Sequence, residues 1–326
     1  MKSVLITGAG GFIGRHLVAE LLAQGIAVKA LMLPTEAIPE YWGDKVKIIR
    51  GDIRRLMELA DEIGEFDTLF HLAAIVSDWG AKQEHVDITV HGTEQAIALA
   101  LKNSARFVVT TSIAAYGSKM GSGILDEQTQ RGTPASNYEY VKQRQEDVTL
   151  KAVRENGLHA TLIRPSNVYG VGSVWVNRFV DKLAQQEPSL MGDGNWDAGL
   201  VHVRHVVQAM TLAAQSTTLP AGEIFVIADN PGVTWKQYLD ALANTLDLPK
   251  AKSIPNWLAR ALAPVLEGVG KLINQKNPPL VTNLAYRLTG VESIFNSDKA
   301  KKMLGYKPEI TLEQAMQEIK TDFEQR

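Results

Sequence analysis

Short apolar runs alternate with amphipathic stretches through the first half of the chain. Six runs have the length and apolar character of buried strands: 4–7, 27–33, 46–49, 68–72, 106–111 and 160–163. Between them, apolar side chains recur at helical spacing, most clearly over 84–102 and 138–155. Strands that alternate with helices in this way predict right-handed βαβ units, and therefore an α/β fold built on a doubly wound parallel sheet.

The pattern loosens after residue 170, where short apolar segments are separated by turns that contain glycine or proline. We therefore divide the chain into a sheet domain and a smaller, mostly C-terminal portion. The sheet domain covers 1–170, with 200–230 returning to it, and the smaller portion comprises 171–199 and 231–326. A chain of 326 residues is long enough to bury a core of this size.

A glycine-rich turn follows the first apolar run. It reads Thr7-Gly8-Ala9-Gly10-Gly11-Phe12-Ile13-Gly14. Gly8, Gly11 and Gly14 let the backbone turn tightly and approach a phosphate, and the helix that starts behind them offers free N–H groups and a partial positive charge. Strand, turn and helix in this order predict a binding site for a dinucleotide pyrophosphate in a Rossmann-type domain.

A tyrosine and a lysine four residues apart carry the strongest catalytic signal. Tyr138 and Lys142 fall on one face of the helix predicted over 138–155. A phenol has a pKa of about 10, and a neighbouring ammonium is expected to lower it, so that Tyr138 exchanges a proton with a substrate alcohol. The plain alternative is an exposed helix that carries an aromatic and a basic residue at this spacing.

Ser112 belongs with this pair because it follows the apolar run 106–111. The carboxyl ends of the strands of a doubly wound sheet face the ligand crevice, so its hydroxyl is expected to orient a carbonyl or alkoxide oxygen there. A serine that merely caps a turn is the alternative. A glycine turn, a strand-end serine and the Tyr138–Lys142 pair in this order favour the catalytic interpretation.

With these motifs the chain resembles the extended short-chain dehydrogenases/reductases along nearly its whole length. Further segments that carry the resemblance are 51–53, 71–74 and 164–170. The resemblance implies NAD or NADP as cofactor, bound by 1–170, and a substrate-binding role for the smaller portion. It also implies a homodimer that packs through 84–102 and 138–155.

The resemblance assigns catalysis to Ser112, Tyr138 and Lys142. It implies the following cofactor contacts: Gly8, Gly10, Gly11, Phe12, Ile13, Gly14, Asp52, Ile53, Leu72, Ala73, Ala74, Tyr138, Lys142, Pro165, Asn167 and Val168. Among these, 52–53 would flank the adenine, 73–74 would line the nicotinamide ribose and phosphate, and 165–168 would border the nicotinamide amide.

Later segments, at 76–80, 192–195, 200–203, 206–209 and 304–308, resemble the 3β-hydroxysteroid dehydrogenase-like group of this family. That likeness implies an NAD(P)-dependent oxidoreductase that transfers a hydride to or from a secondary alcohol or ketone on a bulky apolar substrate, sterol-like or long-chain. The alternative is a nucleotide-sugar epimerase or dehydratase with tightly bound NAD, which uses the same three residues. A redox-inactive NAD(P)-binding sensor is a third interpretation, which the intact catalytic set disfavours.

The cofactor preference stays open at this stage. An acidic residue at the end of the second strand would bind a ribose 2′-hydroxyl, and an arginine would accommodate a 2′-phosphate. The chain has neither there, because 31–34 reads Leu-Met-Leu-Pro. Arg15 and Arg54 are candidates for a phosphate contact, or for solvated surface residues.

Composition excludes several other functions. The formal net charge is −2 with no long run of one sign, so a nucleic-acid partner is not expected, and the partner is a small-molecule substrate. The absence of cysteine excludes disulfides and cysteine nucleophiles. The seven histidines do not cluster with carboxylates at ligand spacing, so no metal site is expected. With no leader and no long apolar stretch, we expect a cytoplasmic protein.

The stretch 257–273 forms a broad apolar stripe with few polar residues. It is either a core-packing helix kinked by Pro264 or a lid over an apolar substrate, which could also touch a membrane surface. If Trp175, Trp196 and Trp257 line one cavity, they favour an apolar substrate.

Overall fold

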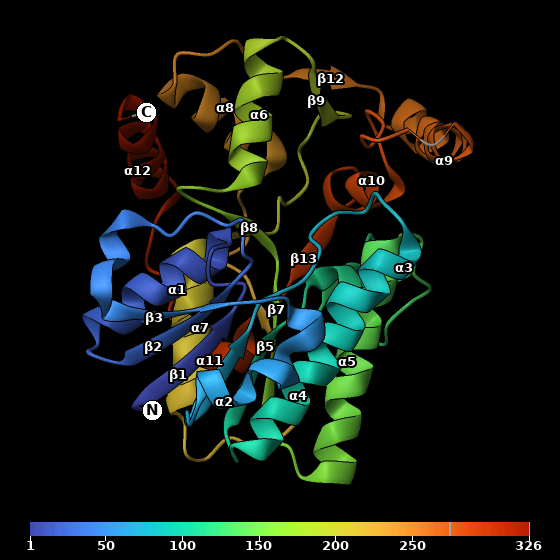
Figure 1. Ribbon diagram of the computed structural model, residues 1–326. Coiled ribbons are helices and arrows are strands. Elements are labelled where there is room, and N and C mark those ends of the chain that lie inside the picture. The colour runs from blue at the N-terminus through green and yellow to red at the C-terminus, as the bar shows by residue number, and fades with distance from the viewer. Residues whose placement is uncertain (274, 326) are drawn as a thin grey trace.

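Seven parallel strands form one sheet at the centre of the computed structural model, which describes residues 1–273 and 275–325 (Figure 1). Positions 274 and 326, both in the predicted smaller portion, lie outside the described residues. Across the sheet the strands are β11 (Glu223–Ile227), β7 (Ala160–Pro165), β5 (Arg106–Thr110), β4 (Thr68–His71), β1 (Ser3–Thr7), β2 (Ala27–Met32) and β3 (Val46–Arg50). All six predicted strands are present, and the doubly wound α/β fold is confirmed.

The sheet grows in opposite directions from β1. The strand β2 pairs with one edge of β1 and β4 pairs with the other, so the switch point lies between β1 and β4. In open parallel sheets, ligands bind in the crevice at the carboxyl ends of the strands at this switch point. The glycine turn follows β1, so its position is consistent with a dinucleotide site.

Helices cover both faces of the sheet and enclose two apolar cores. On one face lie α1 (Phe12–Ala23), α7 (Val203–Gln215) and α11 (Asp298–Leu304). On the other lie α2 (Ala60–Ile63), α3 (Lys82–His85), α4 (Gly92–Lys102) and α5 (Asn137–Asn156). A π-helical turn, Val86–His91, joins α3 to α4, and 3-10 turns cover Glu40–Lys45, Ile53–Leu59 and Ile113–Lys119.

The remaining elements form an upper layer over the carboxyl ends of the strands (Figure 1). They are α6 (Val174–Ala184), β9 (Pro188–Met191), α8 (Trp235–Thr245), β12 (Lys252–Ile254), α9 (Asn256–Leu272), α10 (Asn283–Thr289) and α12 (Leu312–Glu324). A third core, which includes Phe179, Trp235 and Tyr238, holds α6, α8 and α12 together.

Three short strand pairs connect the layers. They are β8 (Asn167–Tyr169) with β10 (Leu200–His202), β6 (Gly123–Leu125) with β13 (Ser293–Phe295), and β9 with β12. Within 200–230, α7 packs on the main sheet and β11 forms its edge strand. The strand β10 instead pairs with β8 in a separate two-stranded sheet. Across 1–273 and 275–325, no helix combines the length and apolar character needed to cross a bilayer.

Candidate active site

The glycine turn lies where β1 meets α1. Gly8 has a φ of +71°, and a Cβ atom there would lie 2.8 Å from the backbone nitrogen of Ala73. A Cβ on Gly14 would collide with the carbonyl oxygen of Gly8. The helix α1 begins directly after Gly11, and no side chain of the described residues caps it. The first N–H groups of α1 are therefore available to an anion. This turn therefore fits a pyrophosphate.

The segment after β4 lies directly against this turn. The backbone N–H of Leu72 donates to the carbonyl of Thr7 at 3.1 Å, and that of Ala73 donates to the Thr7 hydroxyl at 3.3 Å. Ala74 follows them at the same strand end. The structure therefore brings 72–74 together with the glycine turn, as the sequence predicts for residues that line one ligand.

The residues predicted to flank an adenine follow β3. Asp52 caps the turn Ile53–Leu59 and forms an ion pair with Arg54, which lowers the pKa of its carboxyl group. Ile53 is buried against Gly92. Arg15 donates from Nε to the carbonyl of Gly10 at 2.7 Å. Arg15 therefore stays beside the glycine turn, whereas Arg54 is engaged by a neighbouring carboxylate.

Glu36 is a candidate site residue that the sequence pattern did not reveal. Its Oε2 accepts a hydrogen bond from the backbone N–H of Leu33 at 2.7 Å, and its Oε1 lies 3.1 Å from where a Cβ on Gly10 would be. The chain reverses after β2, where the N–H of Glu36 donates to the carbonyl of Leu33. This reversal brings an acidic group to the glycine turn from four residues beyond the strand.

Ser112, Tyr138 and Lys142 come together at the carboxyl end of β5. Ser112 accepts a hydrogen bond from the backbone N–H of Ala114 at 3.1 Å, and its hydroxyl also bonds to that of Tyr138. Tyr138 is the second residue of α5, which begins at a capping box between Ser136 and Glu139. Lys142 Nζ lies 5.8 Å from the centroid of the Tyr138 ring. The predicted spacing therefore produces one cluster.

The electrostatics of this cluster differ from the expectation. Burial raises the pKa of Tyr138, and the hydrogen bond from Ser112 offsets this only in part. The shift is therefore opposite in direction to the lowering expected from Lys142. Lys142 is itself buried, which lowers its pKa to about 7, although Glu146 acts in the opposite direction. Desolvation outweighs the hydrogen bond from Ser112 at Tyr138 and the negative charge of Glu146 at Lys142.

A chain of buried hydrogen bonds connects the glycine turn to Lys142. His71 Nδ1 and Nε2 lie 2.8 Å and 2.9 Å from the hydroxyls of Thr7 and Thr93, respectively. Gln145 donates from Nε2 to Thr93 at 3.0 Å and accepts from Lys142 Nζ at 2.9 Å. Burial lowers the pKa of His71 to about 3, so the ring is neutral. The sequence did not reveal this chain, whose members come from two strands and two helices far apart in the sequence.

Thr93 also fixes which ring nitrogen of His71 carries the proton. The Thr93 hydroxyl donates to the carbonyl of Thr89, so it can only accept from His71 Nε2. Nδ1 is then the acceptor for Thr7, whose hydroxyl in turn accepts from the N–H of Ala73. Each group has a partner, and the lysine and the glycine turn are held in one rigid arrangement.

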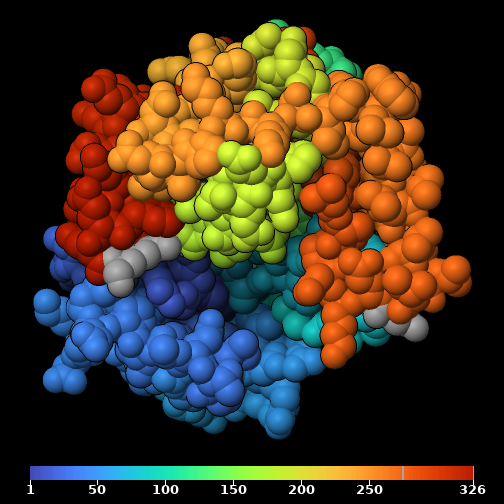
Figure 2. Space-filling model, turned by 90° about the horizontal axis from the view of Figure 1, so that it is seen from above, coloured from blue at the N-terminus to red at the C-terminus, as the bar shows by residue number. Residues whose placement is uncertain are grey.

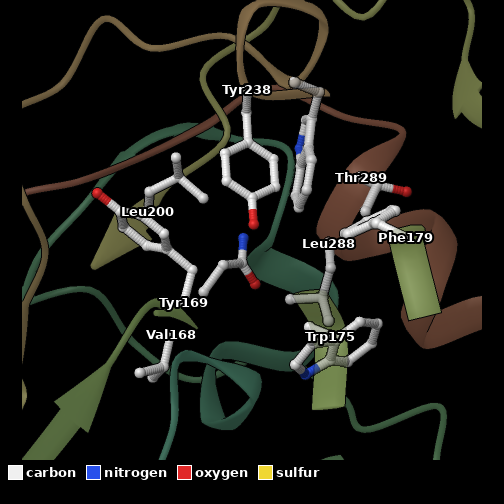
Figure 3. A pocket seen from close by; sticks show the side chains of 10 residues that line it. Val168, Tyr169, Trp175, Phe179, Leu200, Tyr238, Leu288 and Thr289 are labelled. Atoms are coloured by element: carbon white, nitrogen blue, oxygen red, sulfur yellow. The ribbon is translucent and has the colours of Figure 1, made fainter. Parts of the chain in front are cut away.

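Beyond Pro165, the residues predicted to border a nicotinamide reach a narrow apolar cavity of about 20 Å³ (Figure 3). Its lining residues are Asn167, Val168, Tyr169, Trp175, Phe179, Leu200, Trp235, Tyr238, Leu288 and Thr289. None of these ten described side chains is charged. In Figure 3 the hydroxyl of Tyr238 points into the cavity. Asn167 donates to the carbonyl of Ala198 at 2.7 Å.

One lining residue, Leu288, packs against the same apolar cluster as Tyr138. Of the three tryptophans named from the sequence, Trp175 lines this cavity. Trp196 instead donates to the carbonyl of Thr289, and Trp257 is exposed. Trp235 lines the cavity and was missed, because only the tertiary fold brings α8 over β8.

Comparisons with known proteins agree with this geometry. The family model described as NAD dependent epimerase/dehydratase family matches residues 4–228. The chain is 27% identical to the 4-hydroxy-2-methyl-3-oxo-4-farnesyl-3,4-dihydroquinoline-1-oxide ketoreductase of Stigmatella aurantiaca, over 97% of this chain and 95% of that protein. It is also 27% identical to the 3-beta-hydroxysteroid dehydrogenase of Mycolicibacterium neoaurum, over 97% and 89%.

Among solved structures, the UDP-glucuronic acid 4-epimerase of Bacillus cereus in complex with NAD superposes with a TM-score of 0.78. The match covers 99% of both chains at 20% sequence identity. At this identity the similarity concerns the fold alone, and it extends over the sheet domain and the upper layer together.

Proposed function

Because the chain belongs to the NAD dependent epimerase/dehydratase family, we propose that it is an NAD(P)-dependent oxidoreductase that interconverts a secondary alcohol and a ketone on a bulky apolar substrate. The observation that carries the substrate class is the uncharged lining that follows the predicted nicotinamide contacts Asn167 and Val168, in which five of the ten side chains are aromatic. Relatives named for a farnesyl-bearing ketone and for a hydroxysteroid support the same class. A nucleotide sugar carries phosphates, which such a lining would not stabilise.

The three clustered residues divide the work as follows. When bound, the nicotinamide cofactor supplies the hydride transfer. Ser112 holds the substrate oxygen, and Tyr138 exchanges a proton with it through the phenolic oxygen. The raised pKa keeps Tyr138 protonated at neutral pH, so the site is ready to donate a proton to a ketone oxygen. Lys142 donates hydrogen bonds to the carbonyl of Thr110 and to Gln145, which hold its ammonium in place. From there Lys142 positions Tyr138 and the ribose-binding side of the site.

The cofactor-binding role falls to the glycine turn and the strand ends beside it. The turn at 8–14 takes the pyrophosphate at the start of α1, and 52–53, 72–74 and 165–168 line the remainder of the site. Glu36 lies where a carboxylate accepts hydrogen bonds from ribose hydroxyls and repels a 2′-phosphate. We therefore propose a preference for NAD over NADP.

Replacement of the phenolic oxygen tests the proposal. Tyr138→Phe should lower kcat by roughly 10² to 10⁴-fold, because it removes the proton donor, while the Kd for NADH stays unchanged. The matched control is Tyr140→Phe, two residues along the same helix and also half-buried, where Lys82 lies over the ring. Steroid and long-chain ketones serve as substrates, with NADH consumption followed by absorbance. Equal turnover of Tyr138→Phe and wild type would refute the assignment.

The nucleotide-sugar epimerase or dehydratase remains the competing function and makes a different prediction. Such an enzyme would retain NAD through purification and convert a sugar nucleotide with no net formation of NADH. The proposed oxidoreductase would instead exchange cofactor at every turnover and consume one NADH for each ketone reduced. Mass spectrometry of the purified protein, followed by a stoichiometric assay, separates the two.

We also propose that the protein is a cytoplasmic homodimer. The support is the resemblance noted above, together with the packing of α4 beside α5, which would present one joint surface to a partner copy. Sedimentation velocity should give the mass of a dimer, and a mass of 35.7 kDa at all accessible concentrations would contradict the proposal.

A further inference from the structure

The helix α9 packs on the protein through its small residues and exposes large apolar ones, which is the reverse of the pattern expected for a surface helix. Small residues face the body of the protein, where Ala259 and Ala263 are buried with Val281 and where a Cβ on Gly270 would lie 2.9 Å from the ring of Trp79. The residue Glu267 also points inward, and its Oε1 accepts a hydrogen bond from the backbone N–H of Asn283 at 2.6 Å. The core-packing interpretation therefore fits these small residues but not the large side chains at positions 257, 265, 272 and 273.

Those large side chains point outward. Trp257 is 72% exposed, Val265 57%, Leu272 83% and Ile273 65%. With 3.6 residues per turn, these positions share one side of the helix, and the half-exposed Val269 lies between them. Large apolar residues gathered on one exposed helix face mark an interaction site rather than ordinary surface.

The segment that carries this apolar face is rich in basic residues. Over 250–280 the basic residues are Lys250, Lys252, Arg260, Lys271 and Lys276, and the acidic residue is the buried Glu267. The whole chain, by contrast, has a formal net charge of −2. The segment 250–280 therefore carries a net positive charge, which favours an anionic partner. A second copy of the chain would bring the same positive rim against itself.

The helix also lies beside the apolar cavity. Asn256, the first residue of α9, donates from Nδ2 to the carbonyl of Gly290 at 2.9 Å, and Gly290 directly follows the cavity residue Thr289. Figure 1 places α9 at the outer edge of the upper layer, and Figure 2 shows the same orange segment along one side of the upper face. A surface bound by α9 would therefore lie close to the wall of the cavity.

We propose that α9 docks the protein onto an anionic lipid bilayer, lying in the plane of the headgroups. Trp257, Leu272 and Ile273 enter the boundary between headgroups and acyl chains, and Arg260 and Lys276 contact lipid phosphates. An amphipathic helix with a tryptophan-bearing apolar face and basic flanks has the composition of interfacial helices. This inference goes beyond the proposed function, and its test does not depend on catalysis.

Co-sedimentation with vesicles of phosphatidylcholine, alone or mixed with phosphatidylglycerol, tests the proposal on the full-length protein. Wild type should partition onto the mixed vesicles at least about tenfold more strongly than onto phosphatidylcholine. The double variant Trp257→Glu/Leu272→Glu should bind mixed vesicles at least about tenfold more weakly, because it removes two side chains from the acyl boundary. Arg260→Gln/Lys276→Gln should abolish the preference for phosphatidylglycerol.

Met303→Glu provides the matched control, since Met303 is 40% exposed on α11, a helix that packs on the sheet layer away from α9. It should bind vesicles like wild type, and all variants should bind NADH equally. Failure of wild type to bind mixed vesicles would overturn the proposal. So would a wild-type oligomer that the Trp257→Glu/Leu272→Glu variant dissociates in the absence of lipid, because a second copy would then cover the face.

Discussion

Replacement of Lys142 by methionine tests the balance of burial and charge in the catalytic cluster. The ammonium is 3% exposed, and burial lowers its pKa from 10.5 to about 7. In the unfolded chain the same group keeps the ordinary pKa. Between about pH 7 and about pH 10.5, the unfolded state therefore binds one more proton than the folded state, and the wild-type free energy of unfolding rises with pH through this window.

The size of this rise follows from the change in pKa. Each unit corresponds to about 1.4 kcal/mol, so the window contributes about 5 kcal/mol, as an order of magnitude. Methionine at position 142 cannot donate to the carbonyl of Thr110 or to Gln145. These losses cost about 1–3 kcal/mol each, but they do not vary with pH. The pH dependence of the difference between wild type and variant therefore isolates the lysine.

Urea unfolding of wild type and Lys142→Met, followed by tryptophan fluorescence from about pH 6 to about pH 10, measures this difference. We expect the variant to be more stable relative to wild type at the acid end than at the alkaline end, and to lose turnover. Lys151→Met on the same helix is the control, because Lys151 is exposed and pairs with Glu155 at 3.8 Å. A difference that does not change with pH would refute the reasoning.

Two further predictions concern other parts of the molecule. Glu36→Ser should raise the affinity for NADPH relative to NADH by about tenfold, because it removes a negative charge from the site expected for the 2′-phosphate. Fluorescence titration with each cofactor measures this ratio. An unchanged ratio would mean that the ribose binds elsewhere. Glu146→Leu should destabilise the fold by about 3–5 kcal/mol in urea, since it leaves Arg164, now paired at 2.7 Å and 3% exposed, as an uncompensated buried charge. The exposed pair Arg55–Glu58 offers the control Glu58→Leu, which should unfold at the same urea concentration as wild type.

The elements that the sequence predicted are those specified by local spacing. The glycine turn requires residues without a side chain, as the collisions at Gly8 and Gly14 show. The cluster of Ser112, Tyr138 and Lys142 follows from one helix face and one strand end. Glu36 was missed because a reversal of the chain, which no run of apolar residues reveals, returns it to the glycine turn.

The order of apolar runs and helical stripes in the sequence therefore determined the doubly wound sheet and its crevice. It also determined that Ser112, Tyr138 and Lys142 meet in that crevice, because these features depend on periodicity within single elements. Tertiary structure decided how those groups behave. It buried Lys142 and removed enough water from around the half-buried Tyr138 to shift the pKa of each group toward its uncharged form. It also assembled a cavity from residues as far apart in the sequence as Val168 and Thr289. The large side chains of α9 point outward for the same reason. Burial is a property of all the elements that surround a side chain, and no single segment contains it.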